Sequence, residues 1–474
     1  MPRPGSSETP RFIPLWIHVS VVAAVFLAAY ATDAGTGFIK DDAGWIARSR
    51  IAGLPDLVRL FTETGGFFRP VVGLSFGVNY WLFDGSPVGY GWTNLVLAAA
   101  GAAAVYRLGV ALGFARGAAV FAASVWILNF HGINMAVLWL SGRTALLLVL
   151  FSVLAAADAA RGRFVASSAW AVLALLSKEE AVLLPVILVA VAALRPGASP
   201  SRATLLRFAA ALAVILGVYA LLRSTSDAMT PFTAPWYYRF TLAPDVLWKN
   251  VTEYADRAGS LVFGAVMAVV AIAGWRLRLE REEWRLVLMG AIWFVAAFGL
   301  TGFLPVRSSL YACLPSVGAA IAGGAVATAA WRATSARSHQ ILAVAGLVIP
   351  VMFLPIYRTR NVRWTELGKL STVIMHEVAS AARTAPDRWN LIVVDDRTTR
   401  ANVAAALGWA LPAAAELTTG KRPTVWIVPP PPDSTPAEHV LTPTSADAVI
   451  IMRGQQPVRM SRSRWRPSQS AVYQ

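Results

Sequence analysis

Long apolar segments alternate with short polar connections along most of the chain. A membrane-spanning helix needs about 20 predominantly apolar residues to cross the hydrocarbon core of a bilayer. Runs of this kind recur from residue 12 to residue 357, with boundaries uncertain by several residues. The pattern predicts about eleven transmembrane helices, at residues 12–32, 91–113, 116–130, 142–160, 164–177, 180–195, 206–223, 258–276, 286–304, 311–331 and 340–357.

Two connections are too long to be plain turns. The segment 33–90 contains two stretches, 51–61 and 71–83, in which apolar and polar residues alternate with a helical period. We predict that these stretches form helices lying along the membrane surface. The segment 224–257 is rich in aromatic residues, which favours an interfacial belt, although aromatic rings also stack on sugars.

Arginine placement predicts the orientation of the chain. With the N-terminus in the cytoplasm, the short cytoplasmic connections hold most of the arginines, as the positive-inside rule requires. The longer connections on the other face, including 33–90 and 224–257, hold most of the acidic residues. An odd number of spans then places the C-terminus outside the cell, so these two segments are the first and second outer loops.

Residues 358–474 differ in pattern from the rest. A helix is predicted from about 362 to 385, followed by short β-like runs at 391–394, 425–428 and 448–452, and an alanine-rich helical stretch at 401–415. The fold class is therefore an α-helical polytopic membrane protein: a transmembrane domain at 1–357 and a small extracytoplasmic α/β domain at 358–474. Its basic end, 459–466, is expected to be disordered.

Composition agrees with the membrane class. The chain has 474 residues, 56% of them hydrophobic and only 14% charged. The net charge of +16 comes from basic residues in short loops, which argues against a nucleic-acid partner. Cys313 is the single cysteine, so no intramolecular disulfide can form. The richness in alanine and arginine suggests a bacterium, and the expected location is its inner membrane.

An acidic pair follows the first apolar run. Asp41 and Asp42 stand about ten residues beyond it, and adjacent carboxylates can act as a general base and as a metal or substrate anchor. The alternative is a solvated loop start or a helix cap. The sequence establishes no cofactor; a divalent cation, Mg²⁺ or Mn²⁺, is one option for the pair, and metal dependence stays open.

Several cations are predicted on the acid-rich outer face, against the positive-inside bias. They are Arg69, Arg143, Lys178 and Arg307. A phosphate-bearing lipid would account for them as a group, because lysine holds phosphate as a point charge and arginine binds it in a bidentate manner. The alternative for Lys178 is a cap at a helix turn whose ammonium snorkels to the interface. Further candidates nearby are His131, Glu179, Glu180 and Tyr311.

Motifs for other chemistries are missing from the sequence. It has no glycine-rich phosphate loop, no HExxH and no nucleophile elbow. A nucleotide-sugar donor on the cytoplasmic side is therefore unsupported.

Four stretches, in order, resemble the GT-C glycosyltransferases, and within them the protein O-mannosyltransferases and the membrane half of the transmembrane-and-TPR O-mannosyltransferases. They are FIKDDAGWIARS, FFRPVVGLSFGVNYWLFDGSPVGYGWTNLVL, HGINMAVLWLSGRTALLLVLF with ALLSKEEAVLLPVIL, and RSSLYACLPSVG, and the likeness covers roughly residues 10–330. The family pattern often has His-Pro-x-His where this chain has His131-Gly132-Ile133-Asn134, and no TPR array follows. The role of His131 and the choice of acceptor therefore do not carry over.

The resemblance implies a GT-C fold and an inverting transfer of a sugar from a polyprenyl-phosphate donor to an acceptor hydroxyl. The catalytic base would be Asp41 or Asp42, with Asp41 favoured, and the donor phosphate would be bound by Arg143, Lys178 and Arg307. The partners would be the lipid-linked donor, membrane lipids and a protein, glycan or lipid acceptor. Two alternatives remain: a transporter or flippase of a lipid-linked glycan, and a non-catalytic scaffold for glycan assembly.

Overall fold

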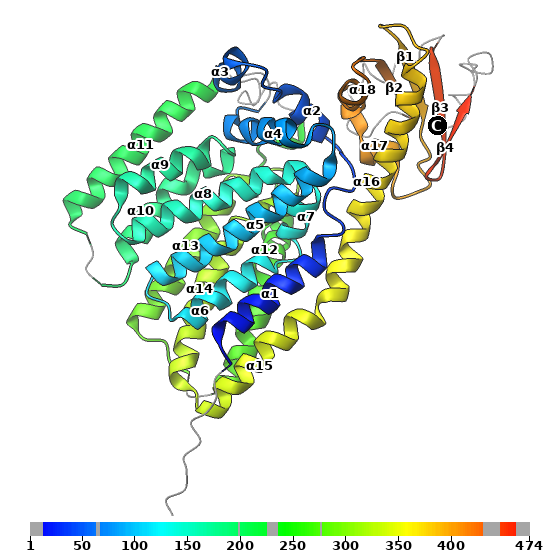
Figure 1. Ribbon diagram of the computed structural model, residues 1–474. Helices are drawn as coiled ribbons and strands as arrows, with labels where there is room; N and C mark the ends of the chain where they lie inside the picture. The colour runs from blue at the N-terminus through cyan, green and yellow to red at the C-terminus, as the bar shows by residue number, and fades with distance from the viewer. Residues whose placement is uncertain are drawn as a thin grey trace, which may run out of the picture. The chain divides into compact units, whose positions relative to one another are not determined.

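The architecture is that of a computed structural model, which describes residues 13–62, 67–197, 200–224, 236–274, 277–429 and 446–460. The chain is mainly helical (Figure 1). The helices before residue 200 are α1 (Leu15–Tyr30), α2 (Asp42–Arg48), α3 (Leu54–Thr62), α4 (Pro70–Phe83), α5 (Pro87–Ala111), α6 (Arg116–Ile127), α7 (Gly132–Leu138), α8 (Arg143–Ala160), α9 (Phe164–Leu175) and α10 (Leu184–Leu194). Those after it are α11 (Arg202–Ser224), α12 (Pro244–Ala273), α13 (Arg281–Phe298), α14 (Pro315–Ala333), α15 (Ala336–Met352), α16 (Leu354–Ala382), α17 (Val403–Ala406) and α18 (Leu411–Thr419).

Each of the eleven apolar runs contains a helix, but not every helix is long enough to span a bilayer. Among the described residues six helices pass on length and apolar character, and a seventh span is added if α6 and α7, bent by 63°, count as one. The six are 87–111, 140–160, 202–224, 244–273, 309–333 and 337–382. The chain is thus a multi-pass membrane protein, and the count of eleven spans stays a prediction.

The chain divides into two compact units, and each is assembled from separate stretches. Unit 1 consists of Met1–Ala29, Ala98–Ile133 and Leu147–Arg358. Unit 2 consists of Tyr30–Leu97, Asn134–Leu146 and Thr359–Gln474. The expected domain boundary between residues 357 and 358 lies inside α16, and the first outer loop belongs to the same unit as the C-terminal segment.

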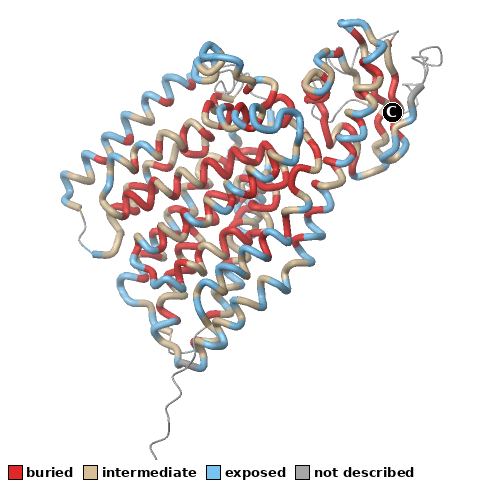
Figure 2. Tube along the Cα trace, viewed as in Figure 1, coloured by how far each residue is buried: buried red, intermediate tan, exposed pale blue. Residues whose placement is uncertain are grey.

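Unit 1 is a bundle of helices in which α13 and α14 pack closely. Gly290 of α13 faces Gly318 of α14, and a Cβ added at either glycine would lie 2.5 Å from the carbonyl oxygen of the other. Small residues allow membrane helices to approach in this way, where apolar burial gives little driving force. Figure 2 shows that burial differs between helices: most residues of α8 are buried, whereas few residues of α11 and α12 are.

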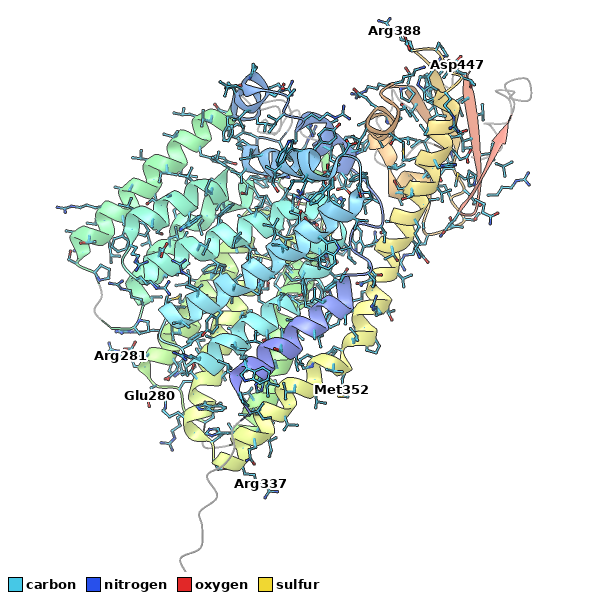
Figure 3. All side chains as sticks on the ribbon, viewed as in Figure 1. Glu280, Arg281, Arg337, Met352, Arg388 and Asp447 are labelled. Atoms are coloured by element: carbon cyan, nitrogen blue, oxygen red, sulfur yellow. The ribbon has the colours of Figure 1, made fainter. Side chains whose placement is uncertain are left out.

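One end of unit 1 carries the arginine-rich connections. Arg332, at the end of α14, pairs with Glu283 at 2.6 Å and with Glu280 at 3.2 Å, at the start of α13. Glu280, Arg281 and Arg337 lie at this same end (Figure 3). The connection before α13 and the connection after α14, which the sequence predicts on the same face of the membrane, are therefore neighbours.

Unit 2 contains the first outer loop. The two stretches expected to be surface helices are helical, as α3 and α4, and both expose large apolar side chains, including Leu54 and Trp81. Residues 63–66, between them, and 225–235, in the second outer loop, lie outside the described residues.

The C-terminal segment forms a four-stranded sheet in the order β2-β1-β3-β4. Strands β1 (Asn390–Val394), β2 (Thr424–Val428) and β3 (Ala448–Arg453) occupy the three expected β-like runs, and β1 is parallel to both of its neighbours. Strand β4 (Gln456–Met460) pairs with β3 in an antiparallel hairpin, whose turn uses Gly454 at φ +60°. The strand thus includes the first two residues of the expected basic tail, and 461–466 lie outside the described residues.

Candidate functional site

The acidic pair stands at the start of α2. Asp41 is the residue before the helix and Asp42 is its first residue, where a negative charge meets the positive end of the helix dipole. The residue before them, Lys40, has a positive φ of 52°, which is uncommon for a residue other than glycine. The chain therefore makes a constrained turn just before the pair.

Asp42 is fully buried, and both of its carboxylate oxygens are occupied. Its Oδ1 accepts hydrogen bonds from the Ser141 backbone N–H at 2.7 Å and from the Ser141 hydroxyl at 2.5 Å. Its Oδ2 accepts the Ile39 backbone N–H at 2.9 Å. Asp42 thus links α2 to the 3₁₀ turn at Leu140–Gly142, which is a structural role.

Asp41 is only half-buried, and one of its oxygens is unengaged. Its Oδ2 accepts the Trp45 indole N–H at 3.1 Å. Its Oδ1 is buried, and within the described residues no donor reaches it in hydrogen-bond geometry. An unsatisfied buried acceptor is costly, and this distinguishes the environment of Asp41 from that of Asp42.

Burial shifts the acidity of both carboxyls. It raises the pKa of Asp42 to about 7, the nearby charge of Asp41 adds to this, and the hydrogen bonds from Ser141 and Ile39 oppose it. Burial also raises the pKa of Asp41, against the Trp45 hydrogen bond, the positive charge of Arg69 and the Ser141 hydroxyl.

A pH-dependent stability is expected from Asp42. Because its pKa is raised from 3.8 to about 7 in the folded protein, the folded state binds more protons than the unfolded state between these values. The free energy of unfolding should therefore fall as pH rises from about 4 to 7, and stay low above that window. Thermal unfolding in detergent at pH 5 and pH 8 measures the effect. The difference should shrink in Asp42→Asn, and an unchanged difference would contradict the assignment.

Arg143 is fully buried and surrounded by protein acceptors. Its Nε donates to Asn94 at 3.2 Å, its Nη1 to Asn79 at 2.5 Å and to Ser75, and its Nη2 to the Tyr90 carbonyl at 3.2 Å. The guanidinium also lies 4.1 Å from the centre of the Phe76 ring. These contacts join α4, α5 and α8.

Arg69 lies near the acidic pair. It precedes α4, and its guanidinium lies 4.2 Å from the Phe67 ring centre and 6.0 Å from that of Trp45. Trp45 in turn donates to Asp41. Asp41, Asp42, Arg69 and Arg143 thus all belong to unit 2.

The remaining candidates belong to unit 1, where Lys178 and Glu180 form a buried ion pair. Their side chains are 4% and 2% exposed, and Nζ lies 2.5 Å from Oε1. The Lys178 ammonium also lies 5.0 Å from the centre of the Tyr311 ring. The pair stands where α9 ends and a 3₁₀ turn at Glu179–Leu183 leads into α10.

Arg223 is a residue that the sequence analysis did not single out. It lies at the end of α11, is 7% exposed, and its Nη1 lies 3.6 Å from the Glu179 carboxylate and 3.1 Å from the Tyr219 hydroxyl. The sequence did contain a signal for it, because Arg223 is one more cation at the end of an apolar run, on the side of the membrane predicted to be acid-rich.

Arg307 forms the most accessible of these ion pairs. Its Nε lies 3.1 Å from Glu253, and the two side chains are 32% and 36% exposed. Arg257 donates to the other oxygen of Glu253 at 2.7 Å. Glu253 therefore pairs with both Arg257 and Arg307, and Arg307 is the one predicted as a phosphate ligand.

His131 lies beside an exposed acid. Its Nε2 is 3.9 Å from Asp256, and its backbone N–H donates to Asn129. The next residue, Gly132, is closely packed: a Cβ there would lie 2.9 Å from the Cys313 sulfur. Across the described part of the chain, no three His, Cys, Asp or Glu side chains gather as metal ligands would.

Comparison with known proteins bears on the fold. The chain matches no protein-family profile and no curated protein. Among solved structures, it is similar to apo ArnT from Cupriavidus metallidurans, with a TM-score of 0.50 and 17% identity over 86% of this chain and 85% of ArnT. ArnT bound to undecaprenyl phosphate gives a TM-score of 0.49 and 14% identity over 87% and 85%.

A further similarity is to the arabinofuranosyltransferase AftD from Mycobacteria, with a TM-score of 0.43 and 16% identity over 81% of this chain. The chain spans only 30% of the length of AftD. At these identities it is the likeness to apo ArnT that shows the fold, and membership of the GT-C glycosyltransferases stays a prediction. The likeness to the O-mannosyltransferase branch stays a prediction.

Proposed function

We propose that the chain is a GT-C-type glycosyltransferase that moves a sugar from a polyprenyl-phosphate donor to an acceptor hydroxyl, with inversion at the anomeric carbon. The acceptor is a protein, a glycan or a lipid. The reaction takes place at the outer face of the bacterial inner membrane, with the N-terminus in the cytoplasm and the C-terminal segment outside.

The observation that carries the proposal is the inequality of the acidic pair. Asp42 uses both oxygens to hold the fold, whereas Asp41 keeps Oδ1 without a donor among the described residues. An acceptor hydroxyl that donates to this oxygen would satisfy it and place the proton for removal. Asp41 is therefore the proposed general base.

The proposed transfer is a single displacement. The acceptor oxygen forms a bond to the anomeric carbon of the donor sugar while its proton passes to Asp41. The bond between that carbon and the phosphate oxygen breaks, and its electron pair leaves with the polyprenyl phosphate. A base on one face and a leaving group on the other give inversion.

The developing charge on the phosphate requires cations. Lys178 and Arg307 are the proposed ligands, and Arg223 joins them because it has the same kind of pairing with a neighbouring glutamate. Cations held in place by fixed carboxylates are preorganised, which is what stabilisation of a departing phosphate demands. Arg143 is proposed instead as a positioning residue, since protein acceptors surround its guanidinium.

The fold supports this class of donor. ArnT, whose fold this chain shares, has been solved with undecaprenyl phosphate bound. We therefore propose a polyprenyl phosphate as the carrier and leave both the sugar and the acceptor open. A divalent cation, Mg²⁺ or Mn²⁺, stays part of the proposal as an option whose test is the effect of EDTA on transfer.

The test is a transfer assay with the purified full chain. Undecaprenyl-phosphate pentoses and hexoses are offered with membrane extract as the acceptor source, and release of undecaprenyl phosphate is measured together with the anomeric configuration of the product. Release of lipid phosphate with an inverted product supports the proposal. A retained configuration, or equal release by Asp41→Asn, would overturn it.

A further inference from the structure

The segment that leads to Asp41 is tied to α16, over 300 residues later in the chain and in the same unit. Asn361 donates to the Asp33 carboxylate at 2.7 Å. The Ser371 hydroxyl donates to the Phe38 carbonyl at 2.5 Å, and the Thr372 hydroxyl shares its proton between the Thr36 carbonyl at 3.2 Å and the Gly368 carbonyl of its own helix at 3.0 Å. The approach to the acidic pair is thus hydrogen-bonded along one side to a single helix.

The contacting face of α16 is set by its sequence spacing. Asn361, Trp364, Gly368 and Ser371 are buried and lie three or four residues apart, so they share one face of the helix. In the middle of this face Gly368 has no side chain, which allows another segment to approach the helix closely. The backbone of the loop occupies the space that a side chain would fill.

The glycine contact is tight on both sides. A Cβ added at Gly37 would overlap the carbonyl oxygen of Gly368, and a Cβ added at Gly368 would overlap the Thr36 hydroxyl and lie 3.1 Å from the Gly37 nitrogen. The obstacle at Gly37 is backbone, whereas the nearest obstacle at Gly368 is the Thr36 hydroxyl, with the backbone of residues 36–37 just behind it. A methyl group at Gly368 must therefore turn the Thr36 side chain and shift the backbone of residues 36–37, just ahead of Asp41, by a few tenths of an ångström.

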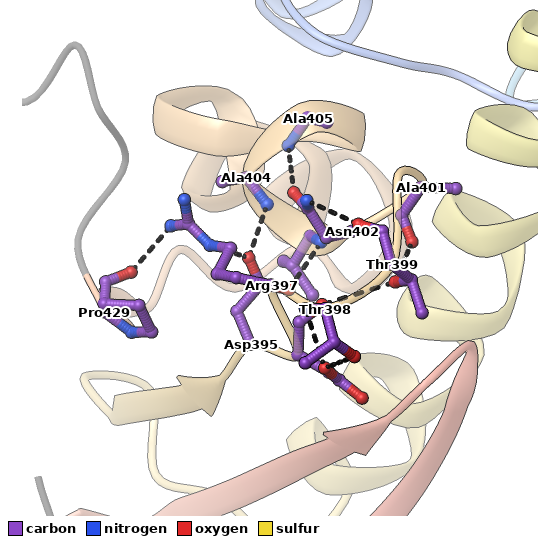
Figure 4. Close-up of polar contacts among 11 residues, drawn as sticks. Asp395, Arg397, Thr398, Thr399, Ala401, Asn402, Ala404, Ala405 and Pro429 are labelled. Carbon is purple, nitrogen blue, oxygen red and sulfur yellow. Dashed lines mark hydrogen bonds and ion pairs between the residues drawn. The ribbon is translucent and has the colours of Figure 1, made fainter. Parts of the chain in front are cut away.

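A second tie comes from α17. The Lys40 backbone N–H, in the residue with positive φ, donates to the Ala406 carbonyl at 2.5 Å. Helix α17 is itself held in place: Asp395 accepts the Val403 and Ala404 N–H groups, and Asn402 accepts that of Ala405 (Figure 4). The constrained turn at Lys40 is thus anchored to the end of strand β1.

We propose that the C-terminal segment of unit 2, residues 361–406, positions the catalytic base, with Gly368, Thr372 and Ala406 fixing the loop that carries Asp41. These residues act through Asp41 and contact no substrate. The inference rests on the proposed function, because it assigns the C-terminal segment a part in the step that Asp41 performs. Base placement is sensitive to shifts of about 1 Å, which can lower a rate by about 100-fold.

The test compares two helical glycines. Gly368→Ala is expected to lower kcat by about 10- to 100-fold, while the Kd for undecaprenyl phosphate changes less than about two-fold, because the proposed phosphate ligands belong to unit 1. Hydrogen exchange at residues 36–46 should become faster. The control is Gly264→Ala, in α12, where an added Cβ meets nothing within 4 Å and no change is expected.

A milder pair keeps the test usable if Gly368→Ala does not fold. Thr372→Val removes the hydroxyl at nearly constant volume and should lower kcat, while the Kd for undecaprenyl phosphate stays unchanged. Thr372→Ser keeps a hydroxyl and should retain the wild-type kcat. If Gly368→Ala or Thr372→Val folds with the kcat and exchange rates of Gly264→Ala, the positioning role is wrong. If the wild-type chain transfers no sugar, the proposed function fails. Faster hydrogen exchange at residues 36–46 in Gly368→Ala would still show that α16 holds this segment in place.

Discussion

Replacement of Asp41 by asparagine is expected to abolish sugar transfer while the protein stays folded. Removal of a general base lowers a rate by about 10²- to 10⁴-fold. An amide keeps the size of the carboxyl and can still accept the Trp45 indole N–H, so the local structure should survive. Binding of undecaprenyl phosphate should change less than about two-fold, since the base interacts with the acceptor.

Release of undecaprenyl phosphate under single-turnover conditions measures this effect, and thermal unfolding in detergent verifies folding. Asp56→Asn is the matched control, because Asp56 lies in the same outer loop and its contacts are local, with Ala52 and Arg59. Asp42→Asn should behave differently from both: it should lower the unfolding temperature, because a donating amide nitrogen would face Ser141 or Ile39. Full activity in Asp41→Asn would remove the residue from the mechanism.

Disruption of the buried Lys178–Glu180 pair is expected to destabilise the protein strongly. Loss of one partner from a buried ion pair typically costs about 3–5 kcal/mol, because the other charge is left uncompensated. Lys178→Met and Glu180→Gln should each show a cost of this order, given that both side chains are almost fully buried. The double variant should cost much less than the sum of the two single variants.

Chemical denaturation in detergent micelles gives these free energies, and transfer assays on the same variants separate structure from function. If Lys178 binds the donor phosphate, the double variant recovers stability but not transfer. Glu282→Gln serves as the control, since it breaks an exposed pair with Arg285 and should cost less than about 1 kcal/mol. Strictly additive costs would mean that the two charges do not depend on each other.

Local signals in the sequence were enough for the helices and strands. Apolar length and period predicted the helical runs, including α3 and α4, and the short β-like runs at 391–394, 425–428 and 448–452 became β1, β2 and β3. These features depend on residues near one another in the chain. The number of spans does not follow from these local signals, because α9 and α10 are apolar but short, and length alone does not decide whether they cross.

The roles within the candidate site depended on distant contacts that the sequence does not display. Asp41 and Asp42 are identical in type and adjacent, and the hydrogen bonds that Asp42 accepts from Ile39 and from Ser141, 99 residues away, distinguish the two. Arg143 was predicted to be a phosphate ligand because it is a cation that the arginine pattern predicts on the outer face. Its partners Asn79, Asn94 and Tyr90 show the alternative use of such a cation inside a bundle.

The tie between Phe38 and Ser371 has a consequence for biosynthesis. The two residues are 333 positions apart, so a ribosome that adds about 5–20 residues per second takes roughly 20–70 s to make the second after the first. Throughout that interval the acidic loop exists without its anchoring helix. A chain stalled before residue 368 would already carry Asp41 and all three proposed phosphate ligands, yet should be inactive, so activity begins only after α16 has been synthesised.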